Sequence, residues 1–410
     1  MPAKVDRISG KSPPRPIRDR YARDRLSLST NSRLAQTRAT LEHGQVELHR
    51  LLRSAILVAF LGIEGAGCST GTGPSDALNF GPDASRARIS AGAAFPNTIL
   101  PLATPKIGRS YTLVREARTP GNGTIWASAF GNDPSSSGFV NYYSLKGHRQ
   151  VPLGQLSGSL DGPEGMATDR SGNLYVVNTI DDNTLEYEAG ATSPERTLAD
   201  LKGYAPGEVA LGPDGTVYVT NIHGPLPKNC GTFCIPKPGN IVAYAHASTK
   251  PTTVYKTFPA TNAYYPIGIG VDAQNDIFVT YETTAVSGGK GGVVEFVAGA
   301  MTPVDTGIVL GYAGGVGFDA AENLIVSDLL CPCIGVYPPG SKTPSRELVK
   351  TGTPVTFAFG KSGRFIYVAN GVNLDLEVYD YTSDRLVDRI SGGGFTSSTS
   401  PTGIAVWPRL

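Results

Sequence analysis

The chain has 410 residues, with 36 Lys and Arg, 35 Asp and Glu, 50 Gly and 31 Pro. So many helix-breaking residues argue against a long helical bundle. Residues 1–53 contain 12 Lys and Arg but only 5 Asp and Glu, so the rest of the chain is mildly acidic. A body of that charge offers no basic face, which argues against nucleic acid as a partner.

The N-terminal segment predicts export. Residues 1–50 are Arg-rich and lack a regular apolar period, which is typical of a disordered basic extension. Residues 51–68 are interpreted as a signal peptide, because residues 54–63 form an uncharged, mostly apolar run. That run is shorter than the roughly 20 residues needed to cross a bilayer. Because residues 1–50 are unusual for a signal, the sequence also predicts a translation start near Val46, and the alternative is a basic cytoplasmic tail on an uncleaved anchor.

The end of this segment, Gly65-Ala66-Gly67-Cys68, resembles the lipobox of bacterial lipoproteins. The resemblance implies that Cys68 receives a lipid and becomes the new N-terminus. The lipid then anchors the exported protein to a membrane of the cell envelope, for example in the periplasm. An ordinary secretion signal with an incidental Cys is the alternative. Residues 69–106 are rich in Gly, Ser, Thr, Pro and Ala, which indicates a flexible linker. Residues 107–410 form the predicted folded domain.

An internal repeat dominates that domain. Copies begin at Pro163, Pro206, Pro266, Ala313 and Pro354. Each copy has a short apolar run, a polar turn and an aromatic-centred run such as Leu-Tyr-Val-Val-Asn at 174–178, followed by two further runs. Four short strands per 40 to 50 residues, joined by Gly, Asp and Asn turns, predict one blade of a β-propeller.

The ends of the domain complete the ring. Residues 401–407 form an inner-strand run with no partner after it, while residues 123–127 form a second-strand run with none before it. Joined, they make a sixth blade, so the sequence predicts an all-β, six-bladed propeller whose C-terminal strand closes the first blade. In this arrangement the Trp407 strand pairs with the Trp126 strand. The run 110–114 is either an unplaced strand or a rival partner for this blade.

The repeat, with Pro163-Glu-Gly-Met-Ala followed by Gly-Asn-Leu-Tyr-Val-Val-Asn178, resembles NHL-repeat propellers and the related SMP-30/gluconolactonase-like group. The resemblance covers residues 120–410. It implies the propeller fold, and it leaves the activity open because such propellers include scaffolds, lyases and metal-dependent lactonases.

Polar residues gather at one mouth of the predicted ring. The repeat places Asn178, Asn221, Tyr281, Asp328 and Asn370 at the ends of second strands. Glu164 and Glu208 stand near the beginnings of first strands, and His223 follows Asn221 by two. Oxygen ligands that converge on a funnel suit Ca²⁺ or another divalent cation.

The SMP-30-like resemblance implies a metal site built from Glu164, Asn221 and Asp328. Asn178, Glu208, His223, Tyr281 and Asn370 are then the candidate ligand-binding residues. The alternative is that Asn and Asp at strand ends cap turns through the backbone, a role that a repeat reproduces in every blade. For Asp169, Asp214, Asp272 and Asp319, in tight turns on the opposite face, capping is the prediction.

Two insertions lie on the same face as these polar residues, one in the blade of Asn221 and one in the blade of Tyr281. Extra loop on one face of a scaffold is typical of a binding surface, and a tolerated surface insertion is the alternative. The predicted folded domain, residues 107–410, contains no Gly-x-Ser-x-Gly and no His-Glu-x-x-His motif.

Four cysteines follow Cys68. In an oxidising compartment an even number indicates disulfides, and local closure favours Cys230–Cys234 and Cys331–Cys333. A four-thiolate metal site is the alternative. The sequence therefore predicts an exported, lipid-anchored propeller that binds a protein, peptide or glycan. A metal-dependent lactonase or lyase of the SMP-30-like kind is the second hypothesis, and a purely structural surface protein is the third.

Overall fold

The computed structural model describes residues 123–131, 137–147, 150–156, 159–227, 236–256, 265–283, 290–349 and 352–410. All regular structure in these residues is β-strand. No helix long and apolar enough to span a membrane occurs among them. The predicted extension, signal peptide, linker, Cys68 and the run at 110–114 all lie outside the described residues.

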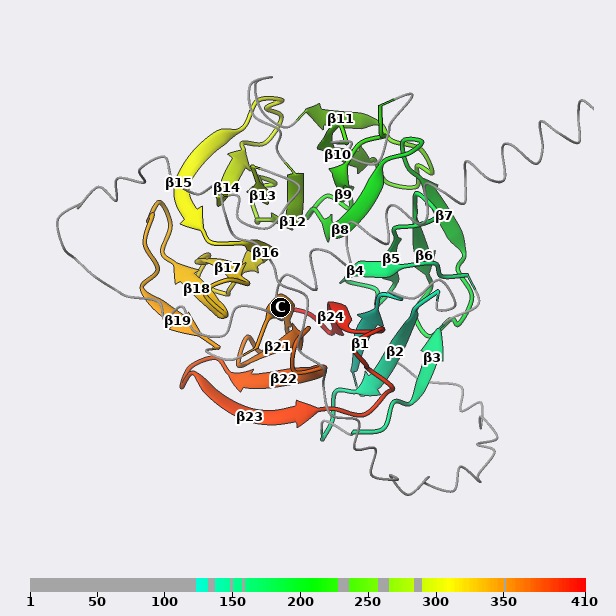
Figure 1. The fold of residues 1–410 in the computed structure, drawn as a ribbon, viewed down its shortest axis with the longest axis vertical. Coiled ribbons are helices and arrows are strands. Elements are labelled where there is room, and N and C mark those ends of the chain that lie inside the picture. The colour runs from blue at the N-terminus through cyan, green and yellow to red at the C-terminus, as the bar shows by residue number, and fades with distance from the viewer. Residues whose placement is uncertain are drawn as a thin grey trace, which may run out of the picture.

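The strands form six antiparallel four-stranded sheets around a central axis, which are the six predicted blades (Figure 1). We name them A to F and give their strands from the axis outward. Blade A has β24 (Pro401–Trp407), β1 (Thr124–Ala129), β2 (Phe139–Ser144) and β3 (Gly154–Leu156). Blade B has β4 (Pro163–Thr168), β5 (Leu174–Asn178), β6 (Asn183–Tyr187) and β7 (Arg196–Ala199).

The other four blades repeat this order without a crossover. Blade C has β8 (Ala205–Leu211), β9 (Val217–His223), β10 (Pro238–Tyr244) and β11 (Thr253–Lys256). Blade D has β12 (Tyr265–Val271), β13 (Ile277–Glu282), β14 (Gly291–Phe296) and β15 (Val304–Leu310). Blade E has β16 (Ala313–Phe318), β17 (Leu324–Asp328), β18 (Cys333–Tyr337) and β19 (Arg346–Leu348). Blade F has β20 (Pro354–Phe359), β21 (Phe365–Asn370), β22 (Asp375–Asp380) and β23 (Arg385–Ile390).

The ring closes as the sequence predicts. The inner strand β24 pairs antiparallel with β1, placing Trp407 opposite Thr124 and Ala405 opposite Trp126. Blade A is therefore built from both ends of the domain. This hydrogen-bonded seam ties the last strand to the first and covers the edge of β1 that faces the axis.

The hydrophobic core is divided into six clusters, one at each junction between neighbouring blades. Between blades F and A, for example, Ile125 and Tyr143 pack with Leu376 and Val378. Both faces of each blade are covered, so a middle strand such as Leu174–Asn178 is buried along its whole length. This explains why the sequence shows continuous apolar runs instead of alternation. Each fully buried aliphatic side chain contributes about 1.5–3 kcal/mol.

Hydroxyl groups link neighbouring blades near the axis. At five junctions a Ser or Thr within the last four residues of a second strand, or just after it, donates a hydrogen bond to a backbone carbonyl of the next inner strand. The pairs are Ser128 to Glu164, Thr179 to Pro206, Thr220 to Ile267, Thr280 to Gly314 and Ser327 to Pro354. These residues are almost completely buried, so the bonds satisfy carbonyls that would otherwise lack a partner.

On the opposite face, hairpin turns join first strands to second strands. Asp169 accepts hydrogen bonds from the backbone N–H groups of Ser171 and Asn173. Asp272 and Asp319 accept equivalent bonds in their turns, and Asp214 accepts one from Thr216. The capping role predicted for these four residues is confirmed.

Candidate functional site

One face of the propeller carries the variable loops, and we call it the loop-bearing face. On it inner strands begin and second strands end, as at Pro163 and Asn178. The connections 130–138, 224–237 and 283–290 are longer there than their counterparts 179–182, 329–332 and 371–374. The insertions in blades C and D thus share a face, as predicted, and blade A adds a third long loop. Parts of all three loops lie outside the described residues.

The predicted strand-end positions are in register. Each of the five residues faces the first or second residue of its own inner strand across the ladder. The pairs are Asn178 with Pro163, Asn221 with Pro206, Tyr281 with Pro266, Asp328 with Ala313 and Asn370 with Pro354. Ala129 faces Pro401 in blade A. The repeat therefore placed these residues at equivalent points of the ring.

Three of the strand-end residues hold the loops of their own blades. Asp328 accepts hydrogen bonds from the N–H groups of Gly311 and Tyr312 at 2.7 and 3.0 Å, and from those of Leu330 and Cys331 at 3.0 and 3.2 Å. Both of its carboxylate oxygens are thereby occupied. Asn370 accepts from Thr353 at 2.9 Å. This is the capping alternative, and a metal-ligand role for Asp328 stays a prediction that these bonds do not favour.

Asn178 has the same role in blade B. Its Oδ1 accepts the N–H of Asp161 at 2.5 Å, and its Nδ2 donates to Asp181 and Asn183 in the turn between β5 and β6. The side chain thus joins the loop that enters the blade to the turn that leaves β5. Its polar atoms are engaged with its own blade.

Asn221 is fully buried and has different partners. Its Nδ2 donates to Asp200 at 3.1 Å and to Asn240 at 2.8 Å. His223, two residues later, is 7% exposed, with Nδ1 at 3.1 Å from the carbonyl oxygen of Gly224. These side chains lie in blade C, whereas Asp328 lies in blade E and Glu164 in blade B. The three predicted metal ligands therefore come from three different blades, and their convergence on one ion stays a prediction.

Tyr281 occupies the predicted register, and the residue after it, Glu282, supplies a buried carboxyl at the end of the same strand. The ring of Tyr281 lies against Gly292, where an added methyl group would come within 2.6 Å of the hydroxyl. The neighbouring Glu282 is 2% exposed, and its Oε1 accepts the N–H of Ala313 at 2.5 Å. Burial, with a smaller contribution from Asp328, raises the pKa of Glu282 to about 8. A carboxylate ending a second strand, one residue past the repeat position, was the signal that could have identified it.

Glu164 and Glu208 lie on adjacent inner strands at the axis. A methyl group placed on Gly207 of β8 would lie 3.7 Å from Oε2 of Glu164, and Glu208 in turn packs beside Gly165 of β4. Burial raises the pKa of Glu208 to about 8, although its carboxyl accepts backbone N–H groups of Val209 and Met166.

Most inner strands have glycine at the level of Glu208. The ladder register aligns Glu208 with Thr356 and with four glycines, at 165, 268, 315 and 403. At Gly315, for example, a methyl group would lie 2.7 Å from Oγ1 of Thr356 on the next strand. Glycine therefore lets the inner strands approach closely, and Glu208 is the exception that puts a carboxyl at this level.

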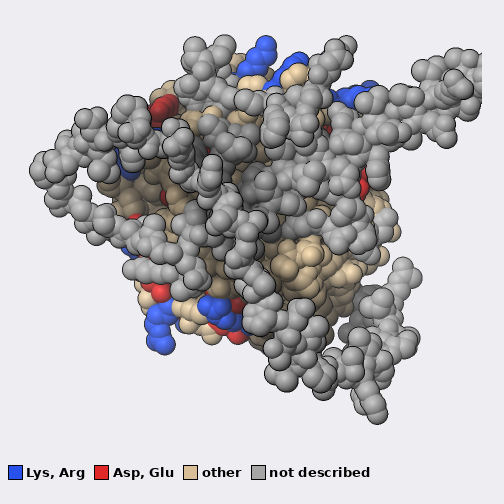
Figure 2. Space-filling model, viewed as in Figure 1, with Lys and Arg blue, Asp and Glu red and all other residues tan. Residues whose placement is uncertain are grey.

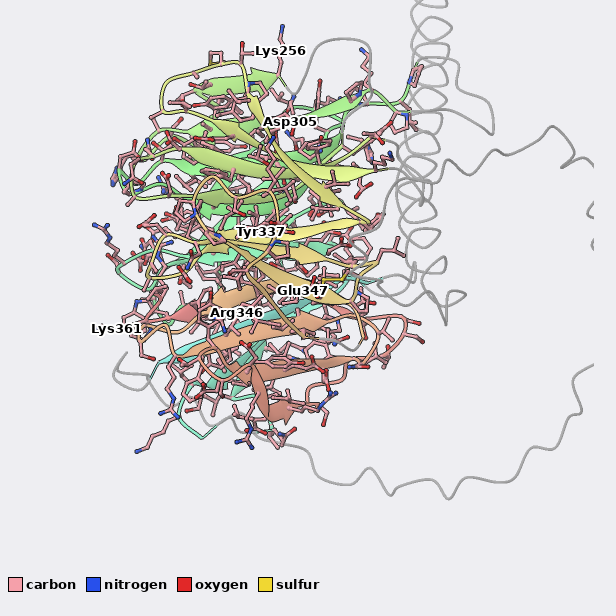
Figure 3. The ribbon with its side chains drawn as sticks, turned by 90° about the vertical axis from the view of Figure 1, so that its left-hand side faces the viewer. Lys256, Asp305, Tyr337, Arg346, Glu347 and Lys361 are labelled. Atoms are coloured by element: carbon pink, nitrogen blue, oxygen red, sulfur yellow. A yellow bond between two sulfur atoms is a disulfide. The ribbon has the colours of Figure 1, made fainter. Side chains whose placement is uncertain are left out.

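Below this level the axis contains a cavity of about 370 Å³ lined by all six inner strands. Glu208 lies at the end of the cavity nearer the loop-bearing face. Asp272, Asp319 and Arg409 lie toward the opposite face. Burial lowers the pKa of Arg409. The C-terminal end of the chain lies at the centre of the ring (Figure 1), where Lys361 donates its backbone N–H to the carbonyl oxygen of Pro408. Seen from the side, Lys361 marks the face opposite the loop-bearing face (Figure 3).

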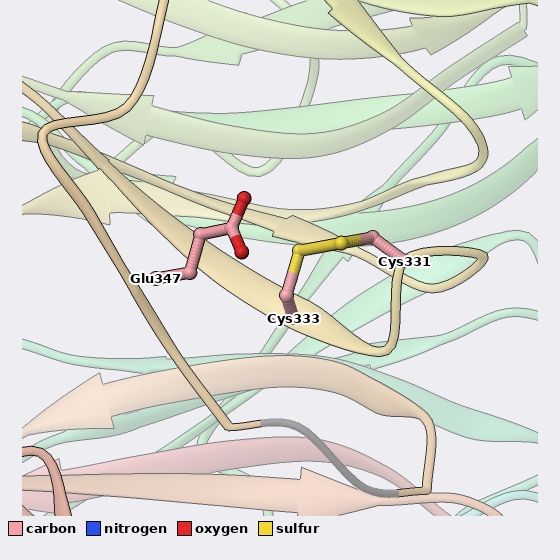
Figure 4. A group of neighbouring side chains, drawn as sticks. All are labelled: Cys331, Cys333 and Glu347. Atoms are coloured by element: carbon pink, nitrogen blue, oxygen red, sulfur yellow. A yellow bond between two sulfur atoms is a disulfide. The ribbon is translucent and has the colours of Figure 1, made fainter. Parts of the chain in front are cut away.

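Cys331 and Cys333 form a disulfide on the loop-bearing side of blade E, with Cα atoms 5.1 Å apart (Figure 4). The carboxylate of Glu347 on β19 lies beside the bridge, with ligand atoms of all three residues within 4.8 Å of one another. This disulfide is one of the two expected from the sequence. Cys230 and Cys234, expected to form the other, lie outside the described residues.

Apolar side chains are exposed beside the strand-end caps. Leu330 follows Asp328 by two residues and is 45% exposed, and Val372 follows Asn370 by two and is 43% exposed. They occupy equivalent positions in the neighbouring blades E and F. On the part of the surface drawn in colour in Figure 2, charges of both signs lie toward the edge of the ring without forming one basic field.

The fold and these features define a β-propeller with a loop-bearing face. No family model matches the chain, and no curated protein matches it. Among solved structures, a chain of the nidogen/laminin complex is 14% identical, with a TM-score of 0.51 over 70% of this chain and 98% of that one. A protein of unknown function from Bacteroides caccae is 10% identical, with a TM-score of 0.49 over the same shares. At these identities the likeness shows the fold alone.

Proposed function

We propose that this protein is an exported propeller, tethered to a membrane by a lipid on Cys68, that binds a protein, peptide or glycan with its loop-bearing face. The observation that carries the proposal is the concentration of three long loops and two exposed apolar side chains, Leu330 and Val372, on that face. Loops held by a rigid scaffold are where binding specificity usually lies.

The capping bonds support a binding role. Asn178, Asp328 and Asn370 fix the loop entries and turns of three blades. A preorganised face loses little conformational freedom when a partner binds, so more of the contact energy appears as affinity. The likeness to a chain in a nidogen/laminin complex agrees with this role, because that propeller-like chain belongs to a protein–protein complex.

Export and lipid attachment are supported by the sequence, through the apolar run at 54–63 and the residues that lead into Cys68. The test is mass spectrometry of the N-terminal peptide from the membrane fraction. We expect a peptide that starts at Cys68 and carries a lipid, and we expect Cys68→Ser to release the protein from that fraction. Recovery of residues 2–40 from the mature protein would contradict export by this signal.

The binding face is tested by photo-crosslinking in cells that express the full chain. A photoreactive amino acid replaces Val372 on the loop-bearing face or, as the matched control, Val297, which is 49% exposed just after β14 on the opposite face. We expect a discrete cross-linked product from position 372, its loss when Leu330→Asp is added, and none from position 297. Equal yields from both positions, or none from either, would refute the assignment of the face.

A second candidate is a metal-dependent lactonase or lyase of the SMP-30-like kind. Its support is the pair Glu164 and Glu208 at the axis, with the raised pKa of Glu208. Of the implied metal ligands, Asp328 fits poorly because its oxygens are occupied. The test is lactone hydrolysis with added Ca²⁺, Mn²⁺ or Zn²⁺, with Glu164→Gln as control. Absence of metal binding and of turnover in the wild type would end this candidate.

A further inference from the structure

Blade C departs from the capping pattern of the other blades. In blades B, E and F the strand-end oxygen accepts an N–H from the loop entering its blade, as Asn178 does from Asp161. In blade C that loop turns back on itself, with the N–H of Tyr204 donating to the carbonyl of Leu201 at 3.0 Å. Oδ1 of Asn221, a fully buried side chain, therefore has no hydrogen-bond partner among the described residues.

The carboxylate beside Asn221 has the same deficit. Oδ1 of Asp200 accepts the N–H of Leu201 at 2.5 Å and Nδ2 of Asn221 at 3.1 Å. Its other oxygen, Oδ2, is buried and has no partner in the described part of the chain. One hydrogen-bonded pair thus contains two buried oxygens without a donor. Native proteins satisfy nearly all such atoms, so the pair requires an explanation.

The surroundings favour a cation over a further donor. Asp182 lies next to the pair, and its backbone carbonyl accepts the N–H of Asp200 at 3.1 Å. Its carboxylate accepts the N–H of Gly203 at 2.9 Å and acts electrostatically on Asp200, while Lys202 acts on Asp182. No Lys or Arg of the described chain forms an ion pair with Asp200. A water molecule would satisfy the oxygens but leave the negative charge uncompensated.

We propose that Asp200 and Asn221 form a site for a hard, oxygen-liganded divalent cation, represented by Ca²⁺, at the junction of blades B and C. Oδ2 of Asp200 and Oδ1 of Asn221 are its protein ligands, and water completes the shell. Asn240 accepts the remaining N–H of Asn221 at 2.8 Å and so fixes the amide with its oxygen available to the ion. The site lies off the axis, is distinct from the Glu164–Glu208 pair and does not depend on the proposed binding function.

The test is calorimetric titration of Ca²⁺ into the chelator-treated full chain. We expect one saturable site. Asp200→Asn should weaken Ca²⁺ binding at least about tenfold, because affinity follows the charge of the ligands. This variant should fold, because the new amide can donate to Oδ1 of Asn221.

Charge addition gives the matched comparison. Asn221→Asp should tighten Ca²⁺ binding about tenfold, because it places a second carboxylate on the ion. Asn178→Asp, at the equivalent but satisfied position of blade B, should leave the affinity within about twofold. No saturable Ca²⁺ binding by the wild type, unchanged binding by Asp200→Asn, or equal effects of the two Asn→Asp changes would each overturn the site. If Asn221→Asp unfolds in chelator, the result for Asp200→Asn decides.

Discussion

The hydroxyl of Thr280 predicts a strong effect of a conservative change at the junction of blades D and E. The side chain is fully buried, donates to the carbonyl oxygen of Gly314 at 2.6 Å and accepts the N–H of Gly268 at 2.8 Å. Thr280→Val keeps the shape but leaves both backbone groups without a partner. Each such group costs about 1–3 kcal/mol, so we expect a loss of about 2–4 kcal/mol in the free energy of unfolding.

The measurement is urea unfolding followed by intrinsic fluorescence, in which the midpoint should fall while the slope stays constant. Thr280→Ser is the matched control, since it keeps the hydroxyl and removes one methyl group, at a cost of about 1 kcal/mol. The reasoning is refuted if Thr280→Val unfolds at the wild-type midpoint, or if Thr280→Ser is the more destabilised of the two.

Three further changes have defined outcomes in the same assay. A Cβ at Gly403 would overlap the carbonyl oxygen of Glu164, so Gly403→Ala should cost about 2–4 kcal/mol, whereas Gly317→Ala, with its nearest neighbour at 3.5 Å, should change stability little; equal effects would contradict this packing. Burial raises the pKa of Glu282 from 4.5 to about 8, so the native carboxyl keeps a proton that the unfolded chain releases, and this group should lower stability by about 1.4 kcal/mol per pH unit between pH 5 and 8, in addition to the effect of Glu208; Glu282→Gln should remove that contribution, and an unchanged slope in this variant would exclude the group as a cause. Asp319→Ala removes two backbone caps and a bond from Tyr381, and should cost about 1–3 kcal/mol; a loss below 0.5 kcal/mol would show that the turn holds without them.

The architecture could be predicted because each blade repeats a local pattern. Turn residues such as Asp169 and strand ends such as Asn178 mark the same points in successive copies, and hairpins connect strands that are neighbours in sequence. The closing seam was predictable for a different reason, since residues 401–407 had no later strand with which to pair.

The site was harder to predict because its chemistry depends on contacts between blades. Thr220 and Thr280 read as ordinary strand residues, and only the packed ring shows that their hydroxyls reach the next blade. The repeat does not predict Glu282, because the strand-end position of the repeat falls on Tyr281, one residue earlier. Within the described ranges, Oδ1 of Asn221 lacks a donor because the N–H of Tyr204 bonds to the carbonyl of Leu201 within the preceding turn. No residue pattern in the sequence predicts that turn.

The seam between β24 and β1 has a consequence for folding during synthesis. As the ribosome releases the domain from its N-terminal end, five sheets can assemble from contiguous sequence, but the sheet containing Trp126 must wait for Trp407. Until then β1 presents an uncovered edge of the kind that promotes aggregation. The interval between synthesis of β1 and synthesis of β24 is therefore the period in which this edge stays unpaired.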